Sequence, residues 1–444
     1  MYMKLPDSVL RPVKKIYGGV HLNHHKNTEE CETVVMPAPE KVFLPMSQHI
    51  GAPATVCVEK GAKVFVGTVI GEASAAVSSP VHSSVSGEVE DIITKPVAGR
   101  PTQFVVIKSD GEMTPDPALA PREVKTPEEL AAAAKDCGLV GLGGAGFPTH
   151  IKLSPPKESE IDYLVINGAE CEPYITADYR ECLESKDDII NGVYLVKKVF
   201  GIKNAVIGIE SNKPQAIEEL AALAAEHKEA DGSVKVMCLP STYPQGAEKV
   251  LIYSATGRKL PGGALPSDVG CIVMNITSIA TLYRFVKTGM PLVRKRLTVD
   301  GSAVEEPKNL YIPLGTPVKD VLDFVGNIDE SAERIISGGP MMGAPISDTD
   351  TVVEKRNNAI LVMKPKRKTV TTNCIRCGRC MMACPMNLSP KDVDAAYSAG
   401  LKEKFEELNV NYCIECGSCA YMCPAKRPLT EIMRIAKQEL RGKK

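Results

Sequence analysis

Two cysteine-rich runs near the C-terminus constrain this chain more than any other feature of its sequence. They read Cys374-x2-Cys377-x2-Cys380-x3-Cys384-Pro385 and Cys413-x2-Cys416-x2-Cys419-x3-Cys423-Pro424. Three cysteines on a tight loop can bind three irons of one cubane, while the fourth is carried away on the following helix. The runs therefore predict two [4Fe-4S] clusters and a protein that transfers electrons.

The same spacing is typical of bacterial two-cluster ferredoxins, in which the fourth cysteine of each run ligates the other cluster. This resemblance implies two crossed ligand sets: Cys374, Cys377, Cys380 and Cys423 for the first cluster, and Cys413, Cys416, Cys419 and Cys384 for the second. Zinc sites favour separated C-x2-C pairs and do not use the third cysteine. Disulfides between such close cysteines would be strained.

Length and composition limit the remaining possibilities. A chain of 444 residues is long for one core and suggests three or four modules. Its first fifteen residues lack the apolar core of a secretory signal, and no uncharged stretch is long enough to span a bilayer. Seven further cysteines are odd in number and scattered, which indicates a reducing cytoplasm.

The charge is uneven along the chain. Residues 364–444 contain sixteen Lys and Arg against eight Asp and Glu, although the whole chain has a net charge of −1. Part of this positive excess offsets the negative charge of thiolate-ligated clusters. The rest could attract an acidic carrier or an anionic membrane surface. Nucleic acid is disfavoured, because the positive excess surrounds the cluster motifs and does not form a groove with interleaved aromatic residues.

Hydrophobic patterns divide the rest of the chain into three parts. Residues 30–110 read as short strands separated by glycines. Their pattern resembles the barrel-sandwich fold of biotinyl and lipoyl domains, but residues 72–82, where those domains carry a modified lysine, contain none, which favours a packing role. Residues 124–290 alternate strand and helix, as in a parallel α/β sheet. Residues 295–350 read as a small α+β module, and a basic linker at 364–368 leads to the cysteine runs.

A glycine-rich stretch, Gly141–Lys152, is the second informative motif. Glycines let the backbone approach a phosphate closely, and successive N–H groups can form an anion-binding nest. Residues 128–140 look helical, so the strand that normally precedes a dinucleotide-binding glycine loop is missing. From the loop alone, a structural turn and a phosphate site remain equally open.

Three polar segments after predicted strands favour the phosphate site. These segments are Asn167–Tyr174 after strand 163–166, Tyr243–Glu248 after strand 234–239, and Asn275–Ser278 after Cys271. Open α/β sheets bind ligands at the carboxyl ends of their strands. Together with the glycine loop, the segments predict one convergent pocket.

Here the chain resembles a known family. Gly143–Thr149 followed by Lys152 resembles the FMN and NADH loop in the flavin-carrying subunit of respiratory complex I, and Asn167–Pro173 resembles its second flavin motif. Residues 295–350 resemble its β-grasp domain. The complete order, from Gly18–His21 onward, is more similar to the C subunit of the Rnf complex, since the flavin-carrying subunit of complex I ends in a single-cluster module. This resemblance spans nearly the entire chain.

The resemblance implies a multidomain α/β and α+β fold with four modules. They are an N-terminal segment with a barrel-sandwich module (1–120), a Rossmann-like FMN/NADH-binding α/β domain (121–293), a soluble-ligand-binding β-grasp module (294–363) and a ferredoxin-like helical module with two [4Fe-4S] clusters (364–444).

Roles for single residues follow from the same resemblance. The loop glycines would lie under the FMN phosphate and NADH: Gly141, Gly143, Gly144 and Gly146. Lys152 would pair with the phosphate or polarise the flavin, and Asn167 and Asn275 would hold the flavin from two strands. Phe147 would stack on an NADH ring, and Glu172 would bind the nicotinamide ribose. The neighbouring pocket positions are Glu170, Tyr243, Gly246 and Glu248. The sequence departs from the complex I pattern at Leu142, which replaces a basic residue, and at Ala247, which replaces an acid.

Flavin and clusters belong together for a chemical reason. NADH gives up two electrons as a hydride, a cluster accepts one at a time, and non-covalent FMN can convert between the two. The resemblance implies an NADH-reactive subunit of a membrane-bound Rnf complex that couples electron transfer between ferredoxin and NAD to Na⁺ or H⁺ translocation. Its partners would be integral membrane and ferredoxin-like subunits, and ferredoxin itself. The protein would be peripheral, on the cytoplasmic face of the membrane.

Three other functions stay open from the sequence. A soluble flavin and iron–sulfur reductase serving cobalamin has a similar layout and would work without a membrane. A non-catalytic subunit that only transfers electrons would hold clusters and no nucleotide. A scaffold with a vestigial glycine loop would show cluster absorbance alone.

Overall fold

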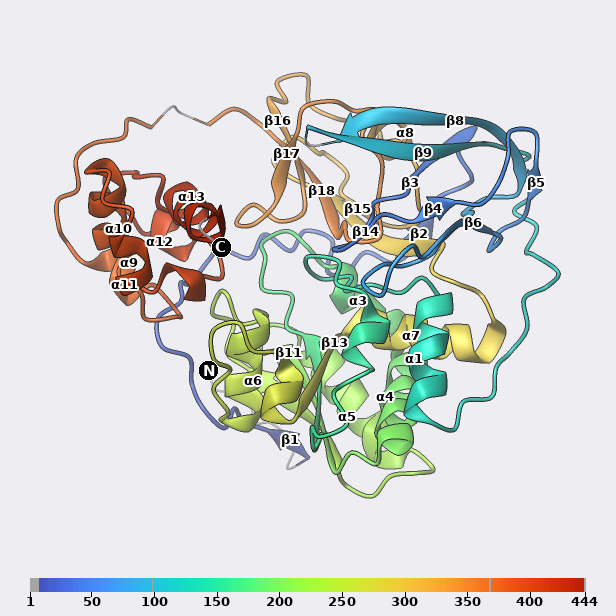
Figure 1. Cartoon of the computed structure of the whole chain (residues 1–444), viewed down its shortest axis with the longest axis horizontal. Coiled ribbons are helices and arrows are strands. Elements are labelled where there is room, and N and C mark those ends of the chain that lie inside the picture. The colour runs from blue at the N-terminus through green and yellow to red at the C-terminus, as the bar shows by residue number, and fades with distance from the viewer. Residues whose placement is uncertain (1–7, 98, 367–368, 443–444) are drawn as a thin grey trace.

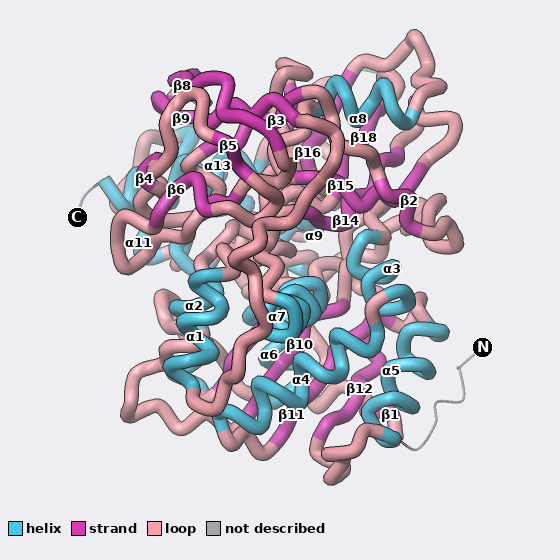
Figure 2. Tube along the Cα trace, turned by 90° about the vertical axis from the view of Figure 1, so that its right-hand side faces the viewer, coloured by secondary structure: helices cyan, strands magenta, loops and turns pink. Residues whose placement is uncertain are grey.

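The computed structural model describes residues 8–97, 99–366 and 369–442. Part of the predicted basic linker, residues 367 and 368, lies outside the described residues, as does the start of the predicted N-terminal segment, residues 1–7. A helical module that contains both cysteine runs lies to one side, an α/β domain occupies the lower part, and two strand-rich modules lie above it (Figure 1). The view turned by 90° shows the same two tiers, with the strand-rich modules above and the α/β domain below (Figure 2).

The α/β domain has the parallel sheet that the alternating pattern predicted. Its strand order is β1-β12-β11-β10-β13, and all four pairings are parallel. The elements are α1 (Pro127–Asp136), α2 (Thr149–Lys152), β10 (Tyr163–Gly168), α3 (Ala177–Glu184), α4 (Lys186–Phe200), β11 (Asn204–Glu210), α5 (Pro214–Glu226), β12 (Val234–Leu239), α6 (Glu248–Thr256), the 3-10 turn η1 (Pro266–Val269), β13 (Cys271–Asn275) and α7 (Ile276–Thr288).

Helices cover both faces of this sheet, so the central residues of strands such as β10 and β13 are apolar. Leu164 and Ile166 belong to the core shared with α1, α4, α5 and α7, whereas Val165 packs with α6 on the opposite face. Local signals set the helix ends. Thr126 forms a capping box with Glu129 at the start of α1, and Pro214 opens α5.

The barrel-sandwich module consists of two small antiparallel sheets, which agrees with the predicted fold. One has the order β3-β9-β8-β5 and the other β4-β6-β7. Their strands are β3 (Lys41–Pro45), β4 (Thr55–Val56), β5 (Lys63–Val64), β6 (Val69–Glu72), β7 (Val81–His82), β8 (Gly87–Val97) and β9 (Arg100–Ser109). The turn between β6 and β7 reaches the α/β domain, where Ala76 O lies 3.1 Å from His150 Nε2. This contact supports the packing role expected for a tip without lysine.

The β-grasp module is a six-stranded sheet of order β17-β16-β18-β14-β15-β2, covered by helix α8 (Val318–Val325). Its strands are β2 (Thr33–Val35), β14 (Arg294–Asp300), β15 (Lys308–Pro313), β16 (Arg334–Ser337), β17 (Ala344–Ile346) and β18 (Ala359–Met363). The helix buries Val318, Val321 and Val325 against the sheet.

The N-terminal segment is shared among the modules. Strand β1 (Val9–Leu10) pairs with β12 of the α/β domain, and β2 pairs with β15 of the β-grasp sheet. Sequence patterns did not reveal either pairing, because two or three residues carry too little periodicity to specify a partner strand.

The C-terminal module is helical, as predicted. It comprises α9 (Arg379–Met382), α10 (Pro390–Ser398), α11 (Lys404–Glu407), the 3-10 turn η2 (Val410–Tyr412), α12 (Ser418–Tyr421) and α13 (Leu429–Gly442). Helix α13 packs Ile432, Met433 and Ala436 into the core of this module. Among the described residues, no helix combines the length and apolar character needed to cross a membrane.

Candidate functional site

The carboxyl ends of the parallel strands meet at one edge of the α/β sheet, and the predicted pocket residues gather there. Asn167 at the end of β10 and Asn275 at the end of β13 are direct partners in the parallel pairing. Segment Tyr243–Glu248 follows β12, and the glycine loop runs past Asn275. Ligands of open α/β sheets bind at such an edge. The structure thus brings the glycine loop and the three polar segments together.

The glycine loop passes Asn275 with no room for side chains at its closest point. A Cβ atom at Gly143 would lie 2.9 Å from Asn275 Nδ2, whereas one at Gly144 would meet no atom of the described residues within 4 Å. The loop is closed by Gly141 N–H, which donates to Phe147 O (2.9 Å). Gly143 and Gly144 are exposed, so a phosphate can approach their backbone closely. The geometry of the loop therefore fits an anionic group such as the FMN phosphate.

The barrel-sandwich module supports this loop from behind. Ile50 N–H donates to Gly146 O (3.1 Å), and a Cβ at Gly146 would lie 3.3 Å from Gln48 O. Gly146 also has a φ of 74°, which favours glycine. The loop is held by a second module as well as by its own domain.

Lys152 and Glu248 form an ion pair at the same edge. Lys152 Nζ lies 3.2 Å from Glu248 Oε2 and 3.4 Å from Val273 O at the end of β13. Both side chains remain partly exposed, so the ammonium can contact a ligand without being extracted from a buried site. The ring of Phe147 is half-buried at the end of the glycine loop, and its stacking role stays a prediction.

Both asparagines connect segments of the pocket. Asn167 Nδ2 donates to Gly246 O (2.8 Å), which ties the end of β10 to the segment after β12. Asn275 Oδ1 accepts from Thr277 N–H (2.9 Å) and so caps α7. Asn275 Nδ2 donates to Asp178 Oδ2 (2.7 Å). Sequence reasoning missed Asp178, because a single acid on a helix gives no signal of its own.

The two acids after Asn167, Glu170 and Glu172, form hydrogen bonds with different parts of the protein. The carboxylate of Glu170 accepts from Asp178 N–H (2.6 Å) and Tyr179 N–H (3.3 Å) at the start of α3. Glu172 Oε2 accepts from Met341 N–H (3.0 Å) in the β-grasp module, while its Oε1 is buried without a partner among the described residues. Burial raises the pKa of each carboxyl to about 7. The nucleotide roles of both acids stay predictions.

Two cavities in the helical module are each lined by four of the predicted cluster cysteines. Cys374, Cys377, Cys380 and Cys423 line one. Cys384, Cys413, Cys416 and Cys419 line the other. In each cavity, three cysteines come from one run and the fourth from the other run. This is the crossed arrangement that the ferredoxin spacing implies.

The backbone around the two cavities repeats the same geometry. Arg376 and Glu415 have φ angles of 56° and 57°, and each is followed two residues later by a glycine with a positive φ. Backbone N–H groups donate to ligand sulfurs, among them Leu388 to Cys384 Sγ (3.4 Å) and Arg427 to Cys423 Sγ (3.5 Å). Such hydrogen bonds are a normal feature of iron–sulfur sites.

The donor set fits cubane clusters better than single ions. Among the described residues, no three His, Cys, Asp or Glu side chains converge as they would around one metal ion. In a [4Fe-4S] cluster, each cysteine binds a different iron, so the sulfurs surround a cavity instead of meeting at a point. The residues present therefore fit the predicted clusters.

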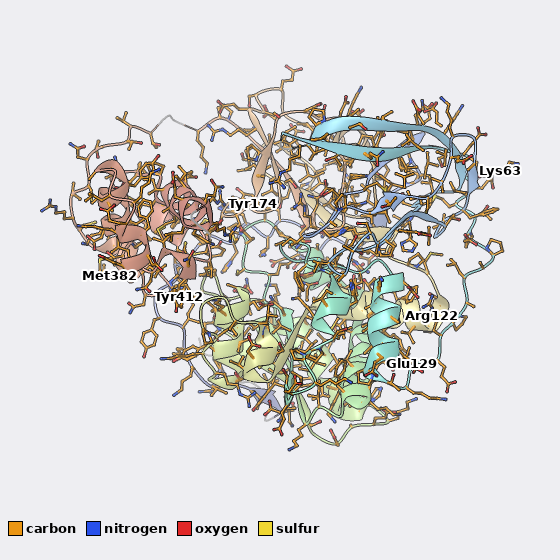
Figure 3. The ribbon with its side chains drawn as sticks, in the orientation of Figure 1. Lys63, Arg122, Glu129, Tyr174, Met382 and Tyr412 are labelled. Carbon is orange, nitrogen blue, oxygen red and sulfur yellow. The ribbon has the colours of Figure 1, made fainter. Side chains whose placement is uncertain are left out.

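The two cavities differ in their position relative to the edge of the α/β sheet at which the pocket residues gather. Cys416 packs in one apolar cluster with Tyr243, Val20 and Ala383, and Tyr243 Oη donates to Cys416 O (2.7 Å). The second cavity therefore adjoins the α/β domain. Cys374 and Cys377 of the first cavity are exposed. In Figure 3, Tyr412 lies on the side of the helical module that faces the α/β domain, and Met382 lies farther toward its outer side.

Four family models match consecutive parts of this chain. The RnfC barrel sandwich hybrid domain matches residues 14–112, the Nuo51 FMN-binding domain residues 134–284, the SLBB domain residues 296–345 and the 4Fe-4S dicluster domain residues 366–424. The matches follow the order of the modules in the structure.

Several curated proteins are similar over nearly the full chain. The chain is 42% identical over 439 residues to the C subunit of the proton-translocating ferredoxin:NAD(+) oxidoreductase complex of Clostridium ljungdahlii, covering 97% of this chain and 95% of that protein. It is also 42% identical to the C subunit of the Na(+)-translocating ferredoxin:NAD(+) oxidoreductase complex of Acetobacterium woodii, covering 95% and 96%. The C subunit of the ion-translocating oxidoreductase complex of Rhodobacter capsulatus is 38% identical, with 99% and 86% covered.

Among solved structures, an NAD+-reducing [NiFe]-hydrogenase in the air-oxidized state has a TM-score of 0.49 and 20% sequence identity. That similarity covers 63% of this chain and 54% of the hydrogenase chain.

Proposed function

The chain belongs to the family of C subunits of Rnf-type ferredoxin:NAD+ oxidoreductase complexes, and from this premise we propose that it is the subunit at which NAD(H) exchanges electrons with the complex. A nucleotide pocket at the edge of the α/β sheet lies next to a four-cysteine cavity. The hydrogen bond from Tyr243 to Cys416 O, at the junction of the two, is the observation that carries this proposal. Its partners are the other subunits of the complex and ferredoxin, and its position is peripheral, on the cytoplasmic face of the membrane.

The residues of the pocket bind and orient, and none of them supplies an acid or base. When bound, FMN supplies the chemistry that exchanges a hydride with NAD(H) and single electrons with the clusters. The exposed backbone of Gly143 and Gly144 contacts its phosphate, and Lys152 offsets the phosphate charge. Asn167 ties the end of β10 to the segment after β12, and Asn275 ties the end of β13 to Asp178 of α3. The second cysteine set (Cys384, Cys413, Cys416, Cys419) holds the cluster nearest to this pocket.

The four modules divide at about residues 120, 293 and 363. Within this division the barrel-sandwich module backs the glycine loop, and the β-grasp loop that contains Met341 covers Glu172. The remaining pocket residues, Phe147, Glu170, Tyr243, Gly246 and Glu248, line the space in which the dinucleotide binds.

Anaerobic reconstitution of the full chain tests this function. FMN and iron are quantified, and bleaching of both chromophores by NADH is followed. Lys152→Met should weaken FMN binding by about tenfold or more, because it removes the charge expected to pair with the phosphate, and should leave the iron content unchanged. Lys157→Met, at an exposed lysine outside the pocket, is the matched control. A wild-type chain that holds both clusters but neither binds FMN nor reacts with NADH contradicts the proposal.

A further inference from the structure

A segment near the N-terminus, residues 18–28, runs along three modules, and we call it the strap. Gly19 N–H donates to Ala383 O of the cluster module (3.0 Å), and Val20 exchanges two backbone hydrogen bonds with Tyr243 of the α/β domain. Farther on, Asn27 Nδ2 donates to Asp300 Oδ1 of the β-grasp module (3.0 Å). The strap is therefore part of no single module and touches the junction of all three.

In its middle, the strap contacts the loop after Asn167. His24 O accepts from Tyr174 N–H (2.9 Å), and the rings of His25 and Tyr174 stack at 5.0 Å. Tyr174 lies near the centre of the molecule, between the upper and lower tiers (Figure 3). The contacts place the strap directly on residues 169–175, which include Glu172.

The loop of residues 169–175 has a strained backbone. Glu170 and Tyr174 have φ angles of 48° and 70°, although neither is glycine. Such conformations are unfavourable for residues with a side chain and persist only when the surroundings hold them. A loop of this kind needs partners that fix its carbonyl groups.

Lys26 supplies those partners. Its buried ammonium donates to Glu170 O (3.0 Å), Glu172 O (2.9 Å) and Ile175 O. An ammonium has three N–H donors, and here each one meets a carbonyl of the same loop. An apolar side chain at this position would leave three carbonyls without their donor.

A second buried lysine holds the start of the loop from the opposite side. Lys213 Nζ donates to Ala169 O (2.8 Å) and pairs with Glu210 Oε2 (3.3 Å). Together, the two lysines bind four of the seven loop carbonyls, while the first residue before the loop, Gly168, is held in β10. The loop conformation is thus held by two lysines from other segments in addition to the contacts of its own side chains.

We propose that Lys26 is a positioning residue of the flavin pocket, which sets the 169–175 loop so that Asn167 and Glu172 face the flavin and nicotinamide. This inference rests on the function proposed above. Lys26 acts only through the loop backbone and contacts no reacting atom. The strap thereby links the shape of the nucleotide pocket to the position of the cluster module, because the same segment contacts the 169–175 loop and the cluster module.

FMN titration of the flavin-free, cluster-containing full chain tests this inference. Lys26→Met should weaken FMN affinity by about tenfold or more, because small displacements of positioning groups carry large costs. Lys295→Met is the matched control. Lys295 is buried, and its ammonium donates to Lys355 O (2.9 Å) and Asn358 Oδ1 (3.0 Å) in the β-grasp module. Lys295→Met should lower the unfolding temperature about as much as Lys26→Met does, and it should leave the affinity for FMN unchanged.

A suppressor distinguishes positioning from general destabilisation. Tyr174→Gly relieves the positive φ, so adding it to Lys26→Met should restore part of the lost FMN affinity. If Lys26→Met gives no folded protein, Lys26→Gln, which keeps two N–H donors, takes its place with the same expected results. Wild-type affinity in the Lys26 variant, or equal loss in the Lys295 control, would overturn the inference. Failure of the wild-type chain to bind FMN would instead overturn the proposed function.

Discussion

Single cysteines decide how the C-terminal module is connected. Cys384 is the last cysteine of the first run, yet it lines the cavity of the second run, and Cys423 does the reverse. The exchange occurs because a short helix that contains the third cysteine carries the fourth, four positions later, away from the ligand loop. Each cluster therefore ties together both halves of the module, and neither half is complete by itself.

Paired substitutions test this exchange. Cys384→Ala combined with Cys413→Ala removes two ligands of the same cavity, so about half of the iron should remain, because the other four cysteines stay intact. Cys384→Ala combined with Cys377→Ala damages both cavities, and nearly all iron should be lost. Iron analysis and EPR of the reduced proteins measure the difference. The reverse result would indicate that each run binds its own cluster.

The carboxyl of Glu172 gives a pH-dependent contribution to stability. Burial raises its pKa from the ordinary value of 4.5 to about 7 in the fold. Between these values the folded state binds more protons than the unfolded state, so this group destabilises the fold as the pH rises from about 4.5 to 7. Above about pH 7 the stability that the protonated carboxyl of Glu172 retains at lower pH is completely lost.

Glu172→Gln removes that dependence, because an amide cannot ionise and can still accept from Met341 N–H. At pH 8 the variant should be more stable than the wild type by the order of 1–3 kcal/mol, and near pH 5 the two should be nearly equal. Unfolding midpoints of both proteins at the two pH values provide the measurement. An equal difference at both pH values would show that Glu172 does not titrate in this range.

At the scale of elements, the strap decides where the cluster module sits. Gly18 has a φ of 68°, and a Cβ atom there would lie 2.8 Å from Cys384 O and 2.9 Å from Met382 O. The two segments can approach this closely only because residue 18 has no side chain. The Gly-Gly pair in the sequence is therefore a packing contact, which a sequence pattern alone does not distinguish from a turn.

Gly18→Ala should loosen the cluster module from the α/β domain. Small-angle scattering should show a larger radius of gyration, and trypsin should cleave sooner between the β-grasp and cluster modules. Gly61→Ala is the matched control, since Gly61 also has a positive φ (84°) but an added Cβ would meet no atom of the described chain within 4 Å. An equal change in radius of gyration and cleavage rate in both variants would mean that the positive φ of the glycine causes the effect, and that the contact of residue 18 with Cys384 does not.

At the scale of the whole molecule, the two cavities have different surroundings. The one that contains Cys416 adjoins the α/β domain, whereas the other presents exposed Cys374 and Cys377 beside Ile375, whose side chain is 67% exposed. Access from solvent should therefore differ between the two clusters, although their ligand spacings are identical.

An iron chelator should reveal this difference as two phases. The first phase should release about half of the iron, from the exposed set. Cys377→Ala, which lacks that cluster, should show the slow phase only, and Cys416→Ala should retain the fast one. Iron release is followed by the absorbance of the chelate under anaerobic conditions. Release in one phase from the wild-type protein would mean that the two sites are equally accessible.

The sequence by itself determined the parts of this protein that depend on local spacing. The cysteine runs predicted two cubane sites with crossed ligands. Apolar periodicity predicted the alternation of strands, such as 234–239, with helices over residues 124–290, because burial imposes a period of 2 or 3.6 on neighbouring residues. Glycines and strand-terminal polar residues predicted which edge of the sheet forms the pocket.

Only the tertiary structure decided how distant segments meet. The pairing of β1 and β2 with sheets of other modules, the covering of Glu172 by Met341, and the three carbonyls bound by Lys26 join residues far apart in the chain. A lysine in a polar N-terminal segment looks like a surface residue, since nothing local indicates that three carbonyls will surround it. Buried polar contacts are fixed by whichever groups the completed fold leaves without partners, and that depends on all modules at once.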